Sequence, residues 1–233
     1  ITIPCPNPPC QRATPFNTFY CTACGIPIEG PTPTDIPTSQ TLQHTLIIDR
    51  HTNNLPTLSN FCCAPEAFSF LGHKCHTIEN AFQFSKHARE DPLFARSILT
   101  MTPGNAKAAG SQRRTPSSLH KQWEQIKTRV MIVAQLCRAI GDAAYSQTLT
   151  STLNTYLVER ASTYHDTTWA TNSNGQGTNL QGLCLMFTRQ NIPYLASTLT
   201  PLHHQHFLTK SLTTHPLAFT NIPITVTLHT SNG

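Results

Sequence analysis

HTIENAFQFSKHAR, residues 76–89, is the stretch around which the rest of the chain is organised. At helical spacing, Glu79, Gln83 and Lys86 fall at i, i+4 and i+7 and therefore share one polar stripe. The neighbouring side carries small and apolar residues, namely Ile78, Ala81, Phe82 and Ser85. Glu79 and Lys86 are two turns apart, roughly 10 Å at about 1.5 Å per residue, which suits holding one ligand from two ends. A solvated helix face would show the same stripe, so this stretch alone leaves both interpretations open.

The neighbouring helices are marked by caps and by apolar spacing. Thr77 is placed to cap the central helix, and Asp91 followed by proline predicts a second helix over 93–99. The Pro103-Gly104 pair is expected to interrupt the chain before a short Ala-rich turn at 105–109. Apolar residues then recur at steps of three and four, which predicts a long core helix carrying Leu119, Trp123, Ile126, Val130, Val133, Cys137 and Ile140.

Strand signals are few and short. Further helices are predicted at 142–154 and 180–190, whereas extended segments are expected at 45–48, 67–71 and 156–159. Helices therefore dominate, and the chain is predicted to fold as a mainly helical α+β protein.

Length and charge limit the possible architectures and ligands. At 233 residues and 25.8 kDa, the chain can hold one well-buried domain and a small accessory module. The formal charge of +5 is concentrated in residues 74–138, where eleven Lys or Arg stand against four acids, a local net of +7. Such an excess suits a phosphate or a nucleic-acid backbone, although a nonspecific surface excess would look the same.

The first 30 residues contain four cysteines at metal-like spacing. Cys5 and Cys10 form one pair, and Cys21 and Cys24 form the other, so both pairs can turn their thiolates toward one ion. We interpret residues 1–30 as a zinc ribbon, with two disulfides or unrelated thiols as the alternatives. So small a module buries too little apolar surface to fold alone, so Zn²⁺ would be structural. No organic cofactor is expected.

The remainder divides into a Pro/Thr-rich linker at 31–43, a main domain at 44–195 and a C-terminal tail at 196–233 without an assigned function. No apolar run of about 18 residues is present, and the N-terminus lacks the layout of a signal peptide. The other five cysteines are interpreted as buried thiols. We therefore expect an intracellular protein, cytoplasmic or nuclear, that is not secreted and binds no membrane, and the sequence indicates no oligomeric state.

Four further pieces flank the central helix: SNF at 59–61, WEQIKTRVM at 123–131, LVERASTYHDTTW at 157–169 and NGQGTNLQG at 174–182. In this order and at this spacing, the pieces resemble the NADAR superfamily, also called the YbiA-like N-glycosidases, over residues 46–192. One departure is the segment after Trp169, which reads ATN where the family often has G-x-G. That departure bears on loop shape and substrate fit more than on chemistry.

The resemblance implies a compact NADAR-like α+β domain that hydrolyses an N-glycosidic bond to ribose in a phosphorylated ligand. Members of the family are linked to breakdown of riboflavin-pathway intermediates and to removal of ADP-ribose from guanine in nucleic acid, where they counter ADP-ribosyltransferase toxins. Carried over to this sequence, the pocket falls on Glu79, Lys86, Trp123, Asp166 and Trp169. The residues around it are Asn60, Phe61, Asn179 and Gly182.

The chemistry of such a reaction asks for two carboxyl groups. Cleaving a ribosyl C–N bond passes through an oxocarbenium-like state, which needs a carboxylate nearby and a proton donor for the leaving nitrogen. Glu79 is predicted to be the main catalytic group, while Asp166 positions ribose or water, and the assignment of acid and base stays open. Lys86 is expected to bind phosphate or to tune Glu79, with Arg50, Arg113 and Arg114 as weaker phosphate ligands. The tryptophans offer flat faces for a base.

Simpler interpretations exist for several of these residues. Trp123 lies on the apolar seam and would otherwise be a core residue, and Asp166 could be an ordinary turn residue. Glu159 is interpreted as a surface charge beside Arg160 and is kept out of the catalytic set.

Three functions follow from the sequence. The first is removal of ADP-ribose from ADP-ribosylated guanine in nucleic acid, DNA rather than RNA, as an antitoxin-like hydrolase. The second is hydrolysis of a small phosphorylated N-riboside, such as a riboflavin-pathway intermediate. The third is a non-catalytic reader of ADP-ribose or NAD, against which the pair of carboxyls argues, because a reader gains nothing from carboxylates beside an anion.

Overall fold

The computed structural model describes residues 2–4, 13–15, 45–49, 55–113, 117–161, 166–172 and 175–198. The predicted zinc ligands, the predicted linker and nearly all of the C-terminal tail lie outside the described residues. The zinc ribbon and the linker therefore stay predictions.

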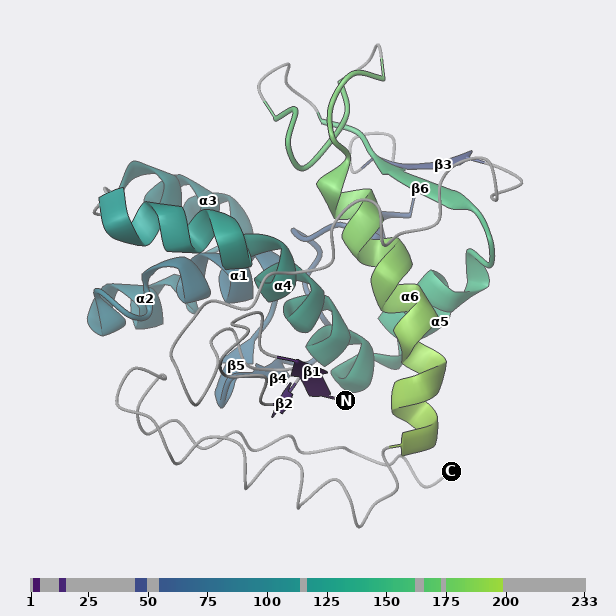
Figure 1. Ribbon diagram of the computed structural model, residues 1–233, viewed down its shortest axis with the longest axis horizontal. Coiled ribbons are helices and arrows are strands. Elements are labelled where there is room, and N and C mark those ends of the chain that lie inside the picture. Colours follow the sequence, from purple (N-terminus) through teal and green to yellow (C-terminus); the bar gives the residue numbers. More distant parts are fainter. Residues whose placement is uncertain are drawn as a thin grey trace.

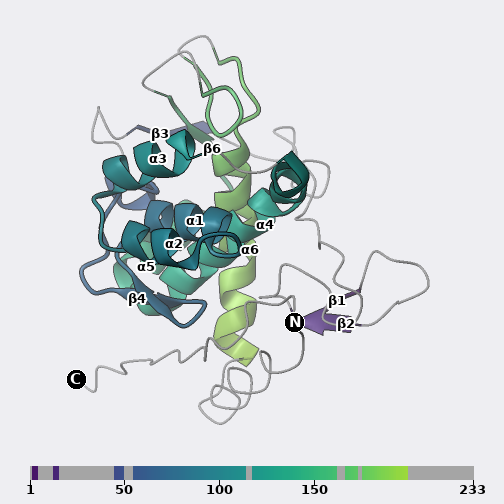
Figure 2. The same ribbon diagram turned by 90° about the vertical axis from the view of Figure 1, so that its left-hand side faces the viewer.

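Helices form most of the described structure, as predicted. They are α1 (Ile78–His87), α2 (Pro92–Ile98), α3 (Pro103–Gln112), α4 (Ser117–Gly141), α5 (Ala143–Ser151) and α6 (Leu180–Thr198), with a short 3-10 helix η3 at Pro56–Leu58. In two views, α1 lies inside a group formed by α2, α3 and α4 (Figure 1, Figure 2). The other side of α4 packs against α6. The α1 stretch is therefore central in space as well as in sequence.

The strands form three two-stranded pairs among the described residues. β3 (Thr45–Ile48) pairs in parallel with β6 (Tyr156–Glu159), and β4 (Phe68–Phe70) pairs antiparallel with β5 (His73–Cys75). The third pair joins β1 (Thr2–Pro4) to β2 (Ala13–Pro15). The mainly helical α+β prediction is thus confirmed. The parallel pairing matters most for the site, because β6 also lies against α6 and ends at the cavity described below.

Local capping explains where the helices begin. The Thr77 hydroxyl accepts a hydrogen bond from the backbone N–H of Asn80 at 3.0 Å, and Asp91 accepts one from Phe94 at 3.0 Å. Both predicted caps are confirmed.

The interruption predicted at Pro103-Gly104 is wrong. A full helix, α3, begins at Pro103, with Thr102 as its cap. Proline is favoured at the first helical position because its missing N–H would have no partner in the helix there, so the same residue that breaks a helix interior starts this one.

The apolar seam of α4 supplies much of the core. Trp123, Ile126, Val130 and Val133 of this seam are buried, whereas Cys137 and Ile140 are partly buried. The four buried residues belong to one continuous cluster with the apolar side of α1 and with the Leu183–Met186 region of α6. Among the described helices, none has the length and hydropathy needed to cross a membrane.

The five cysteines of the described part are free thiols and differ in exposure. Cys75 and Cys184 are buried, as predicted, whereas Cys63 is exposed, so the prediction of a buried thiol is wrong there. Cys63 follows the loop residues 59–61 at the surface, where the sequence offers no periodic signal of exposure.

Candidate active site

A cavity of about 640 Å³ opens between α1, α3, α4 and the segments that follow β6. Its wall brings together most of the residues predicted to form the site: Asn60, Phe61, Glu79, Lys86, Trp123, Asp166 and Trp169. The described cavity wall does not include Asn179 or Gly182. Predicted residues from four separate segments therefore meet in one space, and a cavity of this size matches the range typical of small-molecule sites.

Glu79 lies in the first turn of α1 and is only 5% exposed. Its backbone N–H donates to the carbonyl oxygen of Asn60 at 3.1 Å, and its Oε1 accepts a hydrogen bond from Nε2 of Gln83 at 2.8 Å. Burial raises the pKa of Glu79 above its ordinary value, while the Gln83 hydrogen bond and the charges of Lys107 and Lys86 act in the opposite direction. A carboxyl in this setting keeps its proton to higher pH than an exposed glutamate, which suits it to proton transfer.

Asp166 stands at the mouth of the same cavity and makes two contacts. Its Oδ1 accepts the backbone N–H of Trp169 at 3.1 Å, and its Oδ2 pairs with Nζ of Lys107 at 3.2 Å. The first contact is the turn role that the sequence allowed. It also sets the position of Trp169, so the turn and the cavity wall are built by the same side chain.

Aromatic rings form one side of the cavity. The ring of Phe82 meets Trp123 edge-on at 4.9 Å between centroids and Trp169 edge-on at 5.1 Å. Trp123 is 7% exposed, belongs to the core cluster and also lines the cavity. It is therefore both a core residue and a cavity residue, the two interpretations drawn from the sequence. Lys107 Nζ stands 5.7 Å from the ring centre of Phe61.

Cations line or border the cavity. Lys86 Nζ donates to the carbonyl oxygen of Gly110 at 3.0 Å, and burial lowers the pKa of its ammonium group. Lys107, Lys127 and Arg160 also line the wall. Arg113, a weaker phosphate candidate, lies outside this wall, where it pairs with Asp91 and stacks on Phe94. The other two candidates, at positions 50 and 114, lie outside the described residues.

Asn179 and Gly182 hold the framework behind the wall. Asn179 Oδ1 accepts the backbone N–H of Glu159 at 2.9 Å, and its Nδ2 donates to the carbonyl oxygen of Leu157 at 2.8 Å. A Cβ at Gly182 would overlap that same carbonyl oxygen. Both residues therefore fasten β6 to the start of α6, and their predicted contact with substrate stays a prediction.

Several lining residues were missed by reasoning from the sequence. Glu159, interpreted there as a surface charge, is half-buried and lines the cavity at the end of β6. Its position at the carboxyl end of a predicted strand was the available signal. Lys107 was missed because its helix was predicted to be a turn. Gln181 and Asn60 form a reciprocal amide pair at 2.7 and 3.1 Å across 121 residues, and no local pattern predicts such a pair.

The fold resembles that of a solved bacterial protein. The NMR structure of the E. coli protein YbiA aligns with a TM-score of 0.56 and 27% sequence identity, covering 71% of this chain and 95% of that one. Fold and cavity together thus define a small, mainly helical protein of the YbiA type. A second similar protein, from Nostoc punctiforme, carries the name N-glycosidase Npun_R5314. It is 29% identical over 123 residues, 52% of this chain and 76% of the relative.

The family can be stated directly. Residues 48–193 match the NADAR domain, and the chain belongs to this family. The resemblance drawn from the five sequence pieces is therefore confirmed.

Proposed function

We propose that this protein hydrolyses an N-glycosidic bond to ribose, and that its substrate is ADP-ribosylated guanine in nucleic acid, DNA in preference to RNA. The observation that carries the proposal is the buried Glu79 carboxyl in the wall of a cavity that also presents aromatic rings and several cations. The name of the Nostoc relative, N-glycosidase, supports the bond type. The substrate is the finer part of the proposal.

The reaction adds water across the bond between ribose C1′ and the base nitrogen. As that bond breaks, positive charge develops on the ribose, the leaving nitrogen takes up a proton, and a water oxygen bonds to C1′. In our proposal Glu79 transfers the proton, because burial favours the protonated form of its carboxyl at higher pH than usual. Asp166, paired with Lys107, holds the ribose or the attacking water.

The rest of the wall suits the two ends of such a substrate. The faces of Trp123 and Trp169 can stack against a purine, and aromatic stacking is tolerant of base identity. Lys86, Lys107 and Arg160 can meet the negative charge of phosphates. A ligand with a base at one end and phosphates at the other could contact both the tryptophans and the cations of the wall.

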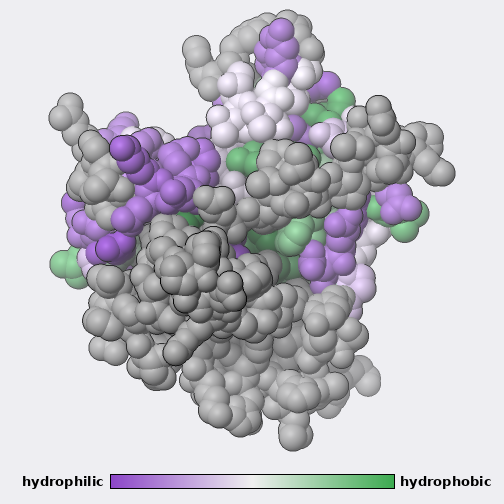
Figure 3. Space-filling view, viewed as in Figure 1, coloured by the Kyte–Doolittle hydropathy of each residue, from purple (hydrophilic) through white to green (hydrophobic). Residues whose placement is uncertain are grey.

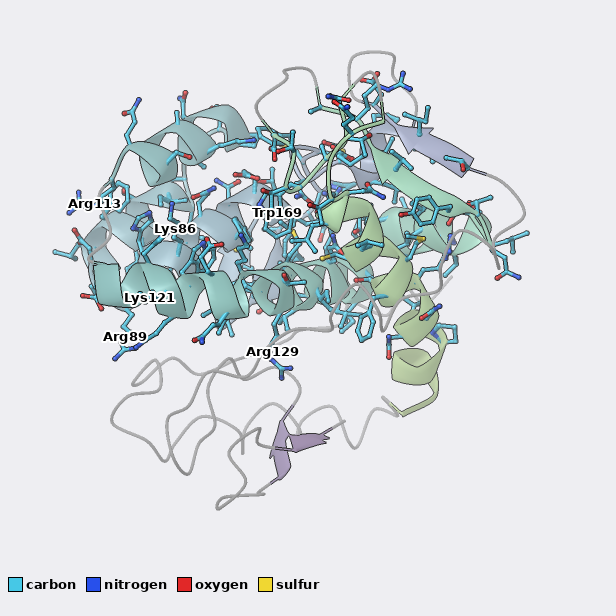
Figure 4. The ribbon with its side chains drawn as sticks, turned by 45° about the horizontal axis from the view of Figure 1, so that its top comes forward. Lys86, Arg89, Arg113, Lys121, Arg129 and Trp169 are labelled. Atoms are coloured by element: carbon cyan, nitrogen blue, oxygen red, sulfur yellow. The ribbon has the colours of Figure 1, made fainter. Side chains whose placement is uncertain are left out.

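The cations outside the cavity favour a polymer over a small ligand. Exposed cations follow the ends of α1 and α3, at Arg89 and Arg113, and α4 carries a third, Lys121. With Lys86 of the wall, these side chains gather at one end of the molecule (Figure 4). The described surface over α2, α3 and the start of α4 is strongly hydrophilic (Figure 3). A nucleic-acid backbone leaving the cavity at this end would meet positive charge.

The test is release of ADP-ribose from an oligonucleotide with ADP-ribosylated guanine. Wild type should release it, and Glu79→Gln should fold normally but lose activity by at least about 10²-fold, the lower range for a lost proton-transfer group. Glu66→Gln, an exposed carboxyl outside the wall, is the matched control and should behave as wild type. Near-normal turnover by Glu79→Gln would remove the catalytic assignment.

A small phosphorylated N-riboside is the second candidate substrate. The volume of the cavity favours it, because about 640 Å³ accommodates a small ligand without any contact at the outer cations. Turnover of such ribosides by a folded protein that leaves the modified oligonucleotide intact would replace the first candidate with the second. Binding of ADP-ribose without turnover of either would indicate a reader.

A further inference from the structure

Gln83 lies between Glu79 and the backbone of α3. It follows Glu79 by one helical turn, lines the cavity and is only 5% exposed. Its Nε2 donates to Glu79 Oε1 at 2.8 Å, whereas its Oε1 has no hydrogen-bond partner among the described residues. Burying an amide oxygen without a partner is unfavourable, so this placement calls for an explanation.

The space that holds Gln83 exists because Gly110 has no side chain. A Cβ at Gly110 would overlap Oε1 of Gln83 and would lie 2.9 Å from its Cδ. The carbonyl oxygen of Gly110 is hydrogen-bonded to Lys86 Nζ at 3.0 Å and to His87 Nε2 at 2.9 Å. One residue of α3 thus contacts three polar side chains on the turns of α1 that follow Glu79.

We propose that Gln83 is a positioning residue for Glu79, and that its close packing against Gly110 keeps the amide donating to the Glu79 carboxyl. The proposal rests on the proposed function for the catalytic role of Glu79. When Glu79 is ionised, the opposite amide orientation would place Oε1 against a carboxylate oxygen, and two acceptors cannot share a hydrogen bond. With the amide fixed, the carboxyl keeps one direction in the cavity, and its ionised form receives a charge-assisted hydrogen bond.

The electrostatics around Glu79 make this contact measurable. Burial raises the pKa of Glu79, and the hydrogen bond from Gln83 is the largest influence that lowers it. The charges that face Glu79 are Lys107 of α3 and Lys86 of α1, which lower the pKa, and Asp166, which raises it. Removing the amide donor should therefore raise the pKa of Glu79 further, whether Glu79 acts as acid or as base.

The first test is a pH titration of the Glu79 carboxyl carbon by ¹³C NMR, with the signal assigned by its loss in Glu79→Gln. Gln83→Met keeps a similar size without the donor and should raise the pKa by about one pH unit, the order expected for losing a hydrogen bond to a charged group. In the pH dependence of kcat, the apparent pKa assigned to Glu79 should rise by the same amount, with little change in KM. Gln122→Met on α4, outside the cavity wall, is the matched control.

The second test alters Gly110 instead. Alanine ordinarily favours a helix over glycine, yet Gly110→Ala should displace the Gln83 amide and raise the pKa of Glu79 as Gln83→Met does. When Gln83 is already alanine, the colliding amide is absent. The double variant Gln83→Ala with Gly110→Ala should therefore match Gln83→Ala alone.

An unchanged Glu79 pKa in folded Gln83→Met and Gly110→Ala would overturn the proposal. Equal additive shifts in the double variant would also overturn it, because the two residues would then act independently. The NMR titration needs no substrate. If the wild type cleaves no N-riboside, the proposed function fails while the titration still decides the role of Gln83.

Discussion

Folding buries the ionisable carboxyl group of Glu79 away from water. Its neighbours on α1 and α3 offset part of the effect of burial, through one amide hydrogen bond and two cations. A carboxyl kept in this condition is unfavourable for the folded state at neutral pH, and such sites are concentrated where proteins perform chemistry.

This balance predicts a pH-dependent stability difference. The pKa of Glu79 is raised above its ordinary value of 4.5, so the folded state binds the proton more tightly than the unfolded state. The stabilisation is full below the unfolded pKa and is lost as pH rises through the folded pKa. Compared with Glu79→Gln, which does not titrate, wild type should therefore become less stable between pH 4.5 and neutral pH. Urea denaturation of both proteins across that range measures the free energy of unfolding at each pH. The same pH dependence of unfolding free energy in the two proteins would contradict the prediction.

At the scale of elements, the cavity depends on how β6 meets α6. The chain passes from β6 through the loop that carries Asp166 and returns to α6, where Asn179 adopts a left-handed conformation with φ of 54°. The Asn179 amide holds Leu157 and Glu159 of β6, and Gly182 allows the Leu157 carbonyl to approach the helix. This contact holds β6, whose end carries the cavity-lining Glu159, against the start of α6.

Gly182→Ala should therefore destabilise the protein by about 1–3 kcal/mol, the usual range for overpacking. Its Cβ would overlap the Leu157 carbonyl oxygen and lie 2.6 Å from the Asn179 amide atoms. Gly104→Ala is the control for stability, because a Cβ there meets nothing within 4 Å. Gly182→Ala should melt at a clearly lower temperature than Gly104→Ala. Equal melting temperatures would show that α6 can shift without loss of stability.

At the scale of the whole molecule, the cavity wall continues into a basic end. Arg89 and Arg113 follow the ends of α1 and α3, and Lys121 lies on α4, all outside the cavity wall, so their charges act together only in the folded protein (Figure 4). Arg113 is paired with Asp91, and Arg89 contacts Glu90 and Gln122, so Lys121 is the clearest probe of this surface.

Lys121→Gln and Arg89→Gln should weaken binding of a single-stranded oligonucleotide. Each lost phosphate contact should reduce the slope of log K against log salt by about 0.7. Lys74→Gln on β5, an exposed lysine outside the wall, should leave the slope unchanged. Salt titrations by fluorescence anisotropy give the slopes. Equal slopes in all variants would show that the oligonucleotide backbone does not bind at Lys121 and Arg89.

The N-terminal cysteines lead to a prediction for the complete chain. Bound through Cys5, Cys10, Cys21 and Cys24, Zn²⁺ should be present at about one ion per protein, as four thiolates complete a structural site. Metal analysis of freshly purified protein measures this ratio. Chelation should increase proteolysis of residues 1–30 and leave the main domain folded. Freshly purified protein without zinc would contradict the prediction of a zinc ribbon.

The sequence by itself determined the approximate positions of the described helices other than α3, the caps at Thr77 and Asp91, and which side of α4 enters the core. These features depend on residues within about four positions of one another, so local periodicity and capping suffice. The five resembling pieces likewise indicated the family. Only the tertiary structure decided that Glu79 and Gln83 are buried, that Lys107 pairs with Asp166 and that Gln181 holds Asn60. Those contacts join segments 59 to 121 residues apart, and burial depends on how α1, α3 and β6 pack, which no local pattern records.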